Sequence, residues 1–268
     1  MKFIIVMFVV LLELSAGILK SPLIAVDHKN MLANIQVEHI DVGMSGFVYH
    51  QITKNHSSIL NNALVVAYDD TKKIATIKLT PYTGLQNNSL PSGKWVASVG
   101  DVAMFAFGYN RGLLIAPSEE IYHQVTKNVD IQWVHPDLFA TVLSFRGHPT
   151  PMKADFLAMS NMSSVGLVFI YLDKKVYMVD SKSFHILGIN EAPLVEDNVQ
   201  LPFYSRIESI PSHWWQFWGE GNDELEAYAP HYYELLVQNN PYDTRLYEII
   251  QKSDAKFHYL LKQFKIGK

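Results

Sequence analysis

Short apolar runs separated by turn residues occupy the first part of the chain and are typical of β-strands. Glycine, asparagine, aspartate and proline stand between the runs, and the run at 74–79 alternates polar and apolar side chains. The runs lie at residues 47–52, 64–68, 74–79, 102–107 and 113–116. Strands at this spacing predict a β-rich, barrel-like module over residues 35–117.

Helical spacing begins after this module. Ser118 is the expected N-cap of a helix that runs to about Lys127, because the two glutamates after it favour the positive end of a helix dipole. A strand is expected at 130–134. Pro136 and Pro151 mark the first turns of two more helices, where a proline needs no backbone N–H partner.

A long apolar run then predicts the centre of a second sheet. Residues 165–172 are continuously apolar, as expected of a strand covered on both faces, and Phe169 and Tyr171 should be buried there. A further strand is expected at 176–179. The order of strands and helices predicts an α/β module with some parallel pairing over residues 118–211.

The last part of the chain has helical spacing. Residues 222–265 form the predicted C-terminal helical segment, in which Pro230 should kink or split the first helix. Residues 243–264 read as one amphipathic helix with most apolar side chains on one face. The predicted fold class is therefore α+β or α/β, with a β-rich barrel-like module, an α/β middle module and C-terminal amphipathic helices.

The first 17 residues have the layout of a secretory signal peptide. An unbroken apolar run at 3–12 follows a lysine, and the small residues after it fit cleavage after Gly17 or Ala16. An uncleaved anchor or a buried N-terminal strand are the alternatives. The run is shorter than the roughly 20 apolar residues that span a bilayer, and no later stretch is long enough. We therefore expect an exported protein without an integral membrane span after cleavage.

Composition excludes several classes of function. The chain of 268 residues is 49% hydrophobic and has a net charge of −4, so it has a core but no basic excess for nucleic acid. It has no cysteine, which rules out disulfides, thiolate metal sites and cysteine nucleophiles. An exported protein without cysteine suits a bacterial envelope, at the cell surface or in the periplasm.

The common motifs of enzymes are missing. We find no phosphate-binding loop, dinucleotide fingerprint, zinc-protease motif or nucleophile elbow, and the histidines lack metal-ligand spacing. We therefore predict no catalytic residues, no metal and no cofactor. Carboxylates that meet only in space leave a hydrolase as one alternative.

A cluster of tryptophans is the most unusual local feature. Trp214, Trp215 and Trp218 lie within five residues. They could form an aromatic platform for a sugar, a membrane surface or a partner protein, since tryptophan combines apolar area with a polar N–H group. Internal packing between the C-terminal helices and the α/β layer is the simpler interpretation, and we favour it.

Five stretches between residues 40 and 210 carry a resemblance to a known family. They are IDVGMSGFVYH (40–50), VGDVAMFAFGYNRGLLIAP (99–117), VHPDLFATVLSFRGHPTPMKADF (134–156), VGLVFIYLDKKVYMVDSKSF (165–184) and LPFYSRIESI (201–210). In this order they resemble the plasminogen-binding N-terminal domain of epsilon-proteobacterial surface proteins. The resemblance implies a non-enzymatic protein that binds host plasminogen through lysine-recognising kringle modules.

If the protein is bound through lysines, the lysines among its last residues are the expected contacts. Kringle modules of this kind pair an acidic subsite with an ammonium, an aromatic trough with methylenes and a basic subsite with a carboxylate. The expected contacts are Lys268 above all, with Lys262 and Lys265 as further candidates. A non-catalytic periplasmic scaffold of an envelope or motility machine is the competing hypothesis.

Overall fold

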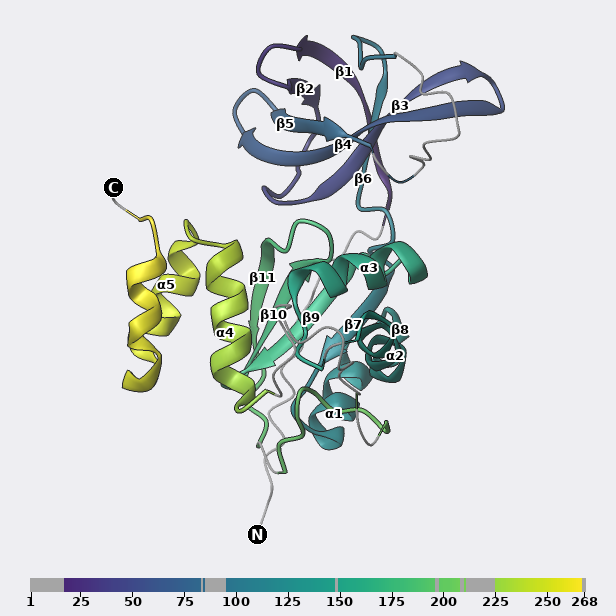
Figure 1. Ribbon diagram of the computed structural model, residues 1–268. Coiled ribbons are helices and arrows are strands. Elements are labelled where there is room, and N and C mark those ends of the chain that lie inside the picture. The colour runs from purple at the N-terminus through teal and green to yellow at the C-terminus, as the bar shows by residue number, and fades with distance from the viewer. Residues whose placement is uncertain are drawn as a thin grey trace, which may run out of the picture.

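Two β-sheets organise the part of the chain that the computed structural model describes, residues 17–82, 84, 95–147, 149–195, 198–207, 210 and 225–266. One sheet closes into a barrel and the other is open and covered by helices (Figure 1). The predicted fold class is confirmed. Residues 1–16 of the expected signal peptide, Trp214, Trp215, Trp218 and Lys268 lie outside the described residues.

The barrel is antiparallel throughout, with the strand order β1-β2-β5-β4-β3-β6. Its strands are β1 (Leu19–Asp27), β2 (Leu32–Gln36), β3 (Ser45–Thr53), β4 (His56–Asp69), β5 (Ile74–Pro81) and β6 (Val102–Phe105). Along β5, Ala75, Ile77 and Leu79 are buried in the barrel, while Lys78 and Thr80 face outwards. This alternation gives the barrel a core of its own.

The barrel differs in extent from the module expected at 35–117. Strand β1 and the start of β2 precede residue 35, and β7 (Arg111–Ile115) belongs to the open sheet instead. In β1 a lysine, a serine and a proline follow Leu19, and an apolar run at 23–26 comes only after them. Only pairing with β2 and β6 establishes β1 as a strand.

The open sheet has the order β11-β10-β9-β7-β8. It contains β8 (Gln132–Val134), β9 (Leu167–Leu172), β10 (Lys175–Asp180) and β11 (Ile186–Glu191) as well as β7. Strands β8 and β9 both pair with β7 in parallel, which confirms the expected parallel pairing. Strand β9 is central, and its Phe169 and Tyr171 are 1% and 0% exposed, as predicted.

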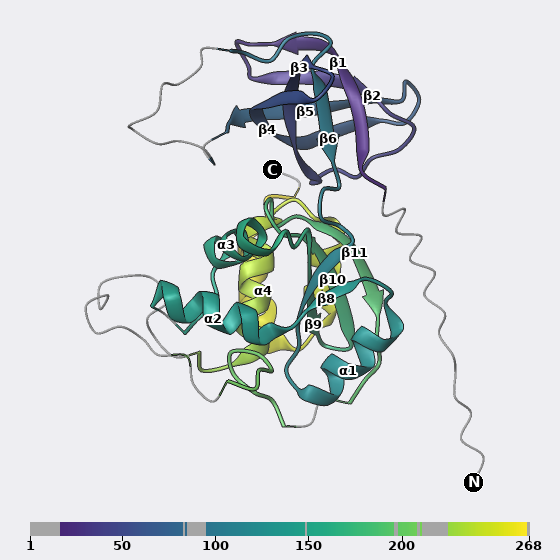
Figure 2. The ribbon, with the colours of Figure 1, turned by 90° about the vertical axis from the view of Figure 1, so that its right-hand side faces the viewer.

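Helices cover both faces of the open sheet (Figure 2). Helix α1 (Glu119–Asn128) packs on one face, and α2 (Pro136–Arg146), α3 (Lys153–Ser163) and α4 (Tyr228–Asn239) pack on the other. The start signals read from the sequence are confirmed for α1 and α2. The Ser118 hydroxyl accepts from the Ile121 N–H at the start of α1, and Pro136 is the first residue of α2.

The C-terminal segment departs from the expected helices in two places. Pro230 lies in the first turn of α4, where its missing N–H has no intrahelical role, so it neither kinks nor splits the helix. The single helix expected at 243–264 is wrong. It divides into α5 (Thr244–Lys252) and a 3-10 helix, η2 (Ala255–Gln263).

Two polar residues cause the division. The Ser253 hydroxyl donates to the Ile250 carbonyl at 2.8 Å and so ends α5. The Asp254 side chain accepts from the Lys256 N–H at 3.2 Å and so begins η2. Short polar side chains that bond to nearby backbone compete with helix continuation, and here they outweigh the apolar periodicity.

Candidate functional site

One carboxylate joins the barrel to the open sheet. Asp180, the last residue of β10, is fully buried, and its Oδ2 accepts from the Ser45 N–H at 3.1 Å and from the Ser45 hydroxyl at 2.7 Å. The Tyr109 hydroxyl donates to the same oxygen at 2.7 Å. Oδ1 accepts from the N–H groups of Lys182 and Ser183 at 3.0 and 2.7 Å. Hydrogen bonds to a buried charge are strong, so this cluster fixes the two modules against each other.

The backbone conformation at position 43, in the same junction, requires a glycine. Gly43 has a φ of +97°, and a Cβ there would lie 2.4 Å from the Cβ of His185. The Ser183 hydroxyl donates to the Gly43 carbonyl at 2.7 Å. Burial raises the pKa of Tyr109, and the Asp180 charge adds to this, so the phenol stays a neutral donor. We call Gly43, Ser45, Tyr109, Asp180, Lys182 and Ser183 the Asp180 junction. Its contacts stabilise the fold.

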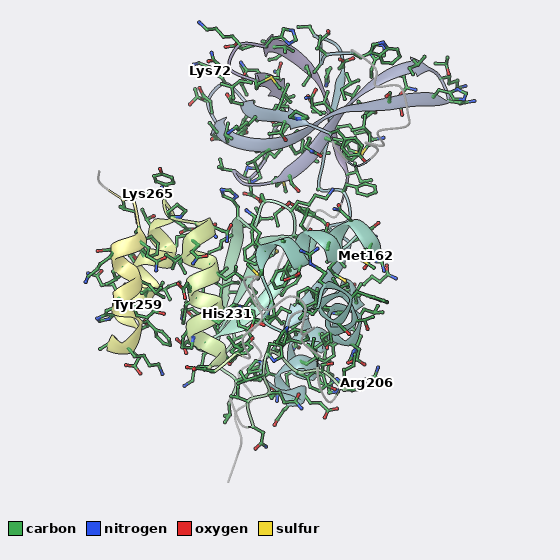
Figure 3. The ribbon with its side chains drawn as sticks, in the orientation of Figure 1. Lys72, Met162, Arg206, His231, Tyr259 and Lys265 are labelled. Atoms are coloured by element: carbon green, nitrogen blue, oxygen red, sulfur yellow. The ribbon has the colours of Figure 1, made fainter. Side chains whose placement is uncertain are left out.

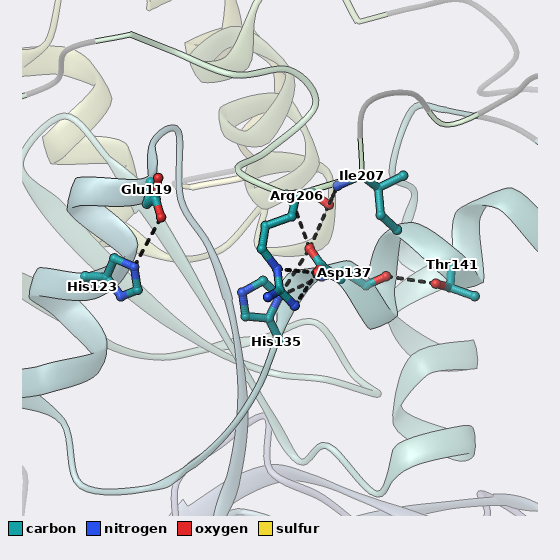
Figure 4. Close-up of polar contacts among 8 residues, drawn as sticks. Glu119, His123, His135, Asp137, Thr141, Arg206 and Ile207 are labelled. Atoms are coloured by element: carbon teal, nitrogen blue, oxygen red, sulfur yellow. Dashed lines mark hydrogen bonds and ion pairs between the residues drawn. The ribbon is translucent and has the colours of Figure 1, made fainter.

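A second polar cluster lies at the start of α2 (Figure 4). The Asp137 carboxylate accepts from the Arg206 backbone at 2.9 Å and from its Nε at 2.7 Å, and the Ser205 hydroxyl donates to it at 3.0 Å. Burial acts to raise the pKa of Asp137, but the hydrogen bonds from Arg206 and Ser205 outweigh it and the pKa is lowered. The ion pair ties the 198–207 segment to α2.

Aromatic rings pack together beside this cluster. Tyr122, His135 and Tyr204 contact one another, with ring centroids 5.3 to 6.1 Å apart. Burial lowers the pKa of His135 even though Asp137 lies beside it, so the imidazole is neutral at pH 7. The arrangement supports the helix start at Pro136 and the loop that carries Tyr204.

The candidate lysines lie at the outer edge of the C-terminal segment. Lys262 is on η2 and Lys265 follows it, and both side chains are exposed. Figure 3 labels Lys265. The buried Leu260 and Phe264 anchor the chain beside them, and the Lys265 N–H donates to the Pro241 carbonyl at 2.8 Å. The backbone is therefore held while the ammonium groups reach into solvent.

Other lysines of the same segment are already paired. Lys256 lies 3.3 Å from Asp254 and Lys252 lies 3.9 Å from Glu248. Neither Lys262 nor Lys265 forms an ion pair with any residue that the structure describes. Lys262 also borders an apolar depression formed with Tyr247 and Phe264. Two of the three predicted lysines are thus exposed and lie three positions apart in the sequence.

A charged groove bears on the alternative that the protein is a hydrolase. It lies between α5, η2 and the turn after β9, and two carboxylates, Asp173 and Asp254, line it. Asp173 accepts from the Tyr233 hydroxyl at 2.8 Å, and Asp254 is paired with Lys256. Both carboxylates are engaged, so this groove does not favour the hydrolase.

The described part of the chain contains neither a cluster of metal-binding side chains nor a membrane-spanning helix. No three histidine, aspartate or glutamate side chains there gather in a way that could hold a metal ion. No helix among those residues has the length and apolar character that a membrane crossing needs.

Sequence reasoning missed the Asp180 junction altogether. Ser45 and Asp180 are 135 positions apart, and Tyr109 and Asp180 are 71 positions apart. Neither aspartate nor serine stands in a motif there. The only local hint is the tight turn at Gly43, which the glycine pair around Ser45 suggests.

These features define a class: a two-module α+β protein, a closed barrel joined to a helix-covered sheet, that presents lysines to solvent. The chain belongs to the family described as plasminogen-binding protein PgbA N-terminal, whose model matches residues 18–236. The resemblance seen in the sequence is thereby confirmed. Lys262 and Lys265 lie C-terminal to the matched residues.

Two relatives are similar over most of the chain. Both are named plasminogen-binding protein PgbA, from Helicobacter pylori strains J99 and 26695, and both are 29% identical over 215 residues. The match takes in 80% of this chain and 46% of each relative, so the chain spans about half their length. No solved structure matches the chain.

Proposed function

We propose that this protein is an exported bacterial envelope protein that binds host plasminogen through lysine-type ligands. The observation that carries the proposal is the pair of exposed, unpaired lysines, Lys262 and Lys265, on a chain whose family is named for plasminogen binding. The name of the family suggests a binding protein and not an enzyme.

The surroundings of the lysines support this role. A lysine-recognising module must bring a carboxylate to the ammonium and apolar area to the methylenes. Lys262 and Lys265 have no ion pair with a described residue to lose, unlike Lys252 and Lys256. Charge-assisted hydrogen bonds to such an ammonium contribute about 1.5–3 kcal/mol each where water is excluded.

Lys268 is the third proposed contact. In a recombinant protein that ends at Lys268, this residue presents an ammonium and an α-carboxylate together, which are the two charges of the expected ligand. Removing Lys268 should then weaken binding to immobilised plasminogen at least about tenfold, equivalent to about 1.4 kcal/mol. Adding Gly-Ser after Lys268 keeps the side chain and moves the carboxylate, so it separates the two contributions.

Competition tests the kind of ligand. We expect 6-aminohexanoic acid, a lysine analogue, to displace the wild-type protein from plasminogen. Binding that resists the analogue would contradict lysine-type recognition. Equal binding with and without Lys268 would assign the contact to other lysines.

The proposed location is tested on cells. Surface labelling of intact cells should reach the protein if it binds plasminogen from outside, whereas a periplasmic scaffold would be labelled only after the outer membrane is opened. Replacement of Val9 and Val10 by aspartate should abolish export, because it interrupts the apolar run of the expected signal peptide.

A further inference from the structure

A cleft lies between the two modules and is lined by residues of both. It has a volume of about 620 Å³ and is lined on one side by the outer face of the barrel and on the other by α3 and the turn after β10. The barrel contributes Asn62, Lys78, Thr80 and Tyr82, and the other module contributes Asn161 and Lys182. Each wall thus carries one lysine.

The registers of the strands place the barrel wall. Lys78 pairs with Leu64 across β5 and β4, and Leu64 pairs with Ser45 across β4 and β3. Neighbouring strands lie about 4.8 Å apart, so the backbones of Lys78 and Ser45 are roughly 10 Å apart. Thr80 and Asn62 form the next outward-facing row.

Two residues of the Asp180 junction, Ser45 and Ser183, line the cleft, and the junction joins its two walls. Ser45 bonds to Asp180 through both its N–H and its hydroxyl, and Lys182 follows Asp180 by two positions and donates its own N–H to the carboxylate. Lys182 is therefore fixed to the module that faces Lys78. A cleft whose walls are joined by buried hydrogen bonds is formed before any ligand arrives.

The charge of the cleft is positive. None of its described lining residues is an aspartate or glutamate. Lys78 and Lys182 form no ion pair with a described residue, and Asp180 beneath them is buried and accepts five hydrogen bonds. Concave surfaces lined by one sign of charge attract ligands of the other sign.

The uncharged polar residues that line the cleft indicate which class of ligand it can bind. Thr80 and Asn161 can bond to sugar hydroxyls, and so can the Asn62 amide oxygen, while the Asn62 Nδ2 donates to the Pro81 carbonyl at 3.0 Å. The half-buried Tyr82 ring can pack on a sugar ring. An acidic peptide would gain from a free strand edge, but β4 and β5 are both paired on either side within a closed barrel. We propose that this cleft binds an acidic oligosaccharide, with its anionic groups between Lys78 and Lys182.

Direct binding measurements test the proposal. The probes are a heparin hexasaccharide, an oligogalacturonate of the same length that carries carboxylates only, neutral cellohexaose, and hexaglutamate. Wild-type protein should bind at least one of the two acidic sugars and should bind cellohexaose and hexaglutamate at least tenfold more weakly. Failure to bind either acidic sugar overturns the proposal, and so does hexaglutamate binding as tightly as the sugars.

Matched variants locate the site. The double variant Lys78→Ala/Lys182→Ala should weaken binding of the acidic sugar at least tenfold, while Lys78→Arg/Lys182→Arg should keep most of it. Lys72→Ala is the control, since Lys72 is an exposed barrel lysine that lies 3.3 Å from Asp69, away from the cleft (Figure 3). If the double variant binds as the wild type does while circular dichroism shows both to be folded, the cleft is not the site.

This proposal and plasminogen binding are separable. The cleft variants leave Lys262 and Lys265 unchanged, and substitution of those two lysines leaves the cleft unchanged. Loss of sugar binding only in the cleft variants, with plasminogen binding kept, is the expected pattern.

Discussion

The Asp180 junction and the C-terminal lysines use charge in opposite ways. Asp180 is buried and accepts five hydrogen bonds from the barrel and from its own module. Lys262 and Lys265 are exposed and have no ion pair with a described residue. A charge that is fully bonded inside the molecule stabilises a fold, whereas an unpaired charge on an anchored surface is available to a partner.

This contrast predicts which substitutions should change the stability of the fold and which should change binding. Buried groups, polar or apolar, should alter the free energy of unfolding. Exposed lysines should alter binding and leave the free energy of unfolding within about 0.5 kcal/mol.

Replacement of Phe169 by alanine gives the largest expected loss of stability. Phe169 lies in the central strand β9, is 1% exposed and contacts Trp133 at a ring-centroid distance of 5.0 Å. The cavity should lower the free energy of unfolding by about 3–5 kcal/mol, measured by chemical denaturation. A loss below about 1 kcal/mol would show that β9 is not the centre of the core.

Replacement of Asp180 by alanine should cost about 3 kcal/mol, because Tyr109 and the buried N–H groups of the junction lose their acceptor. The barrel and the open sheet should then be cleaved apart more readily by limited proteolysis. Asp70→Ala is the control, as its carboxylate is exposed and forms an ion pair with Lys73 at the surface. Equal stability of the two variants would contradict the role given to the junction.

A smaller effect should appear as a dependence on pH. Burial lowers the pKa of His185 and the nearby Lys153 adds to this, against the opposing effect of Asp180. In the unfolded chain the histidine has its ordinary pKa of about 6.5. As the pH falls below about 6.5, the unfolded chain takes up the proton first, so the free energy of unfolding should decrease.

The variant His185→Gln should remove part of that decrease. Burial also lowers the pKa of His231, whose Nε2 lies 2.8 Å from the Pro151 carbonyl oxygen, so some dependence on pH should remain (Figure 3). Denaturation at pH 7.5 and pH 5 measures the difference. An unchanged difference in the variant would mean that His185 is protonated alike in both states.

Local signals in the sequence predicted local structure well. The Ser118 cap, the helix start at Pro136 and the buried run of β9 each depend on neighbours within one element, and each is confirmed. The amphipathic pattern at 243–264 failed because Ser253 and Asp254 bond to the backbone beside them, which a count of apolar positions ignores.

Contacts between distant segments could not be predicted in this way. Asp137 and Arg206 are 69 positions apart, and Ser45 and Asp180 are 135 positions apart. Their pairing follows from the topology of the two sheets. Residue type alone pointed to Lys262 and Lys265. Their exposure and their lack of ion pairs with described residues depend on the fold, in which the buried Leu260 and Phe264 anchor the segment.

The central claim is that Lys262, Lys265 and Lys268 form the lysine-type ligand. Binding to immobilised plasminogen tests this claim most directly. The comparison is between wild type, the variant Lys262→Ala/Lys265→Ala lacking Lys268, and the control Lys72→Ala/Lys73→Ala, whose lysines pair with Asp69 and Asp70. We predict that the first variant loses at least tenfold in affinity with unchanged stability, and that the control binds as wild type. Equal binding by all three proteins would contradict the account.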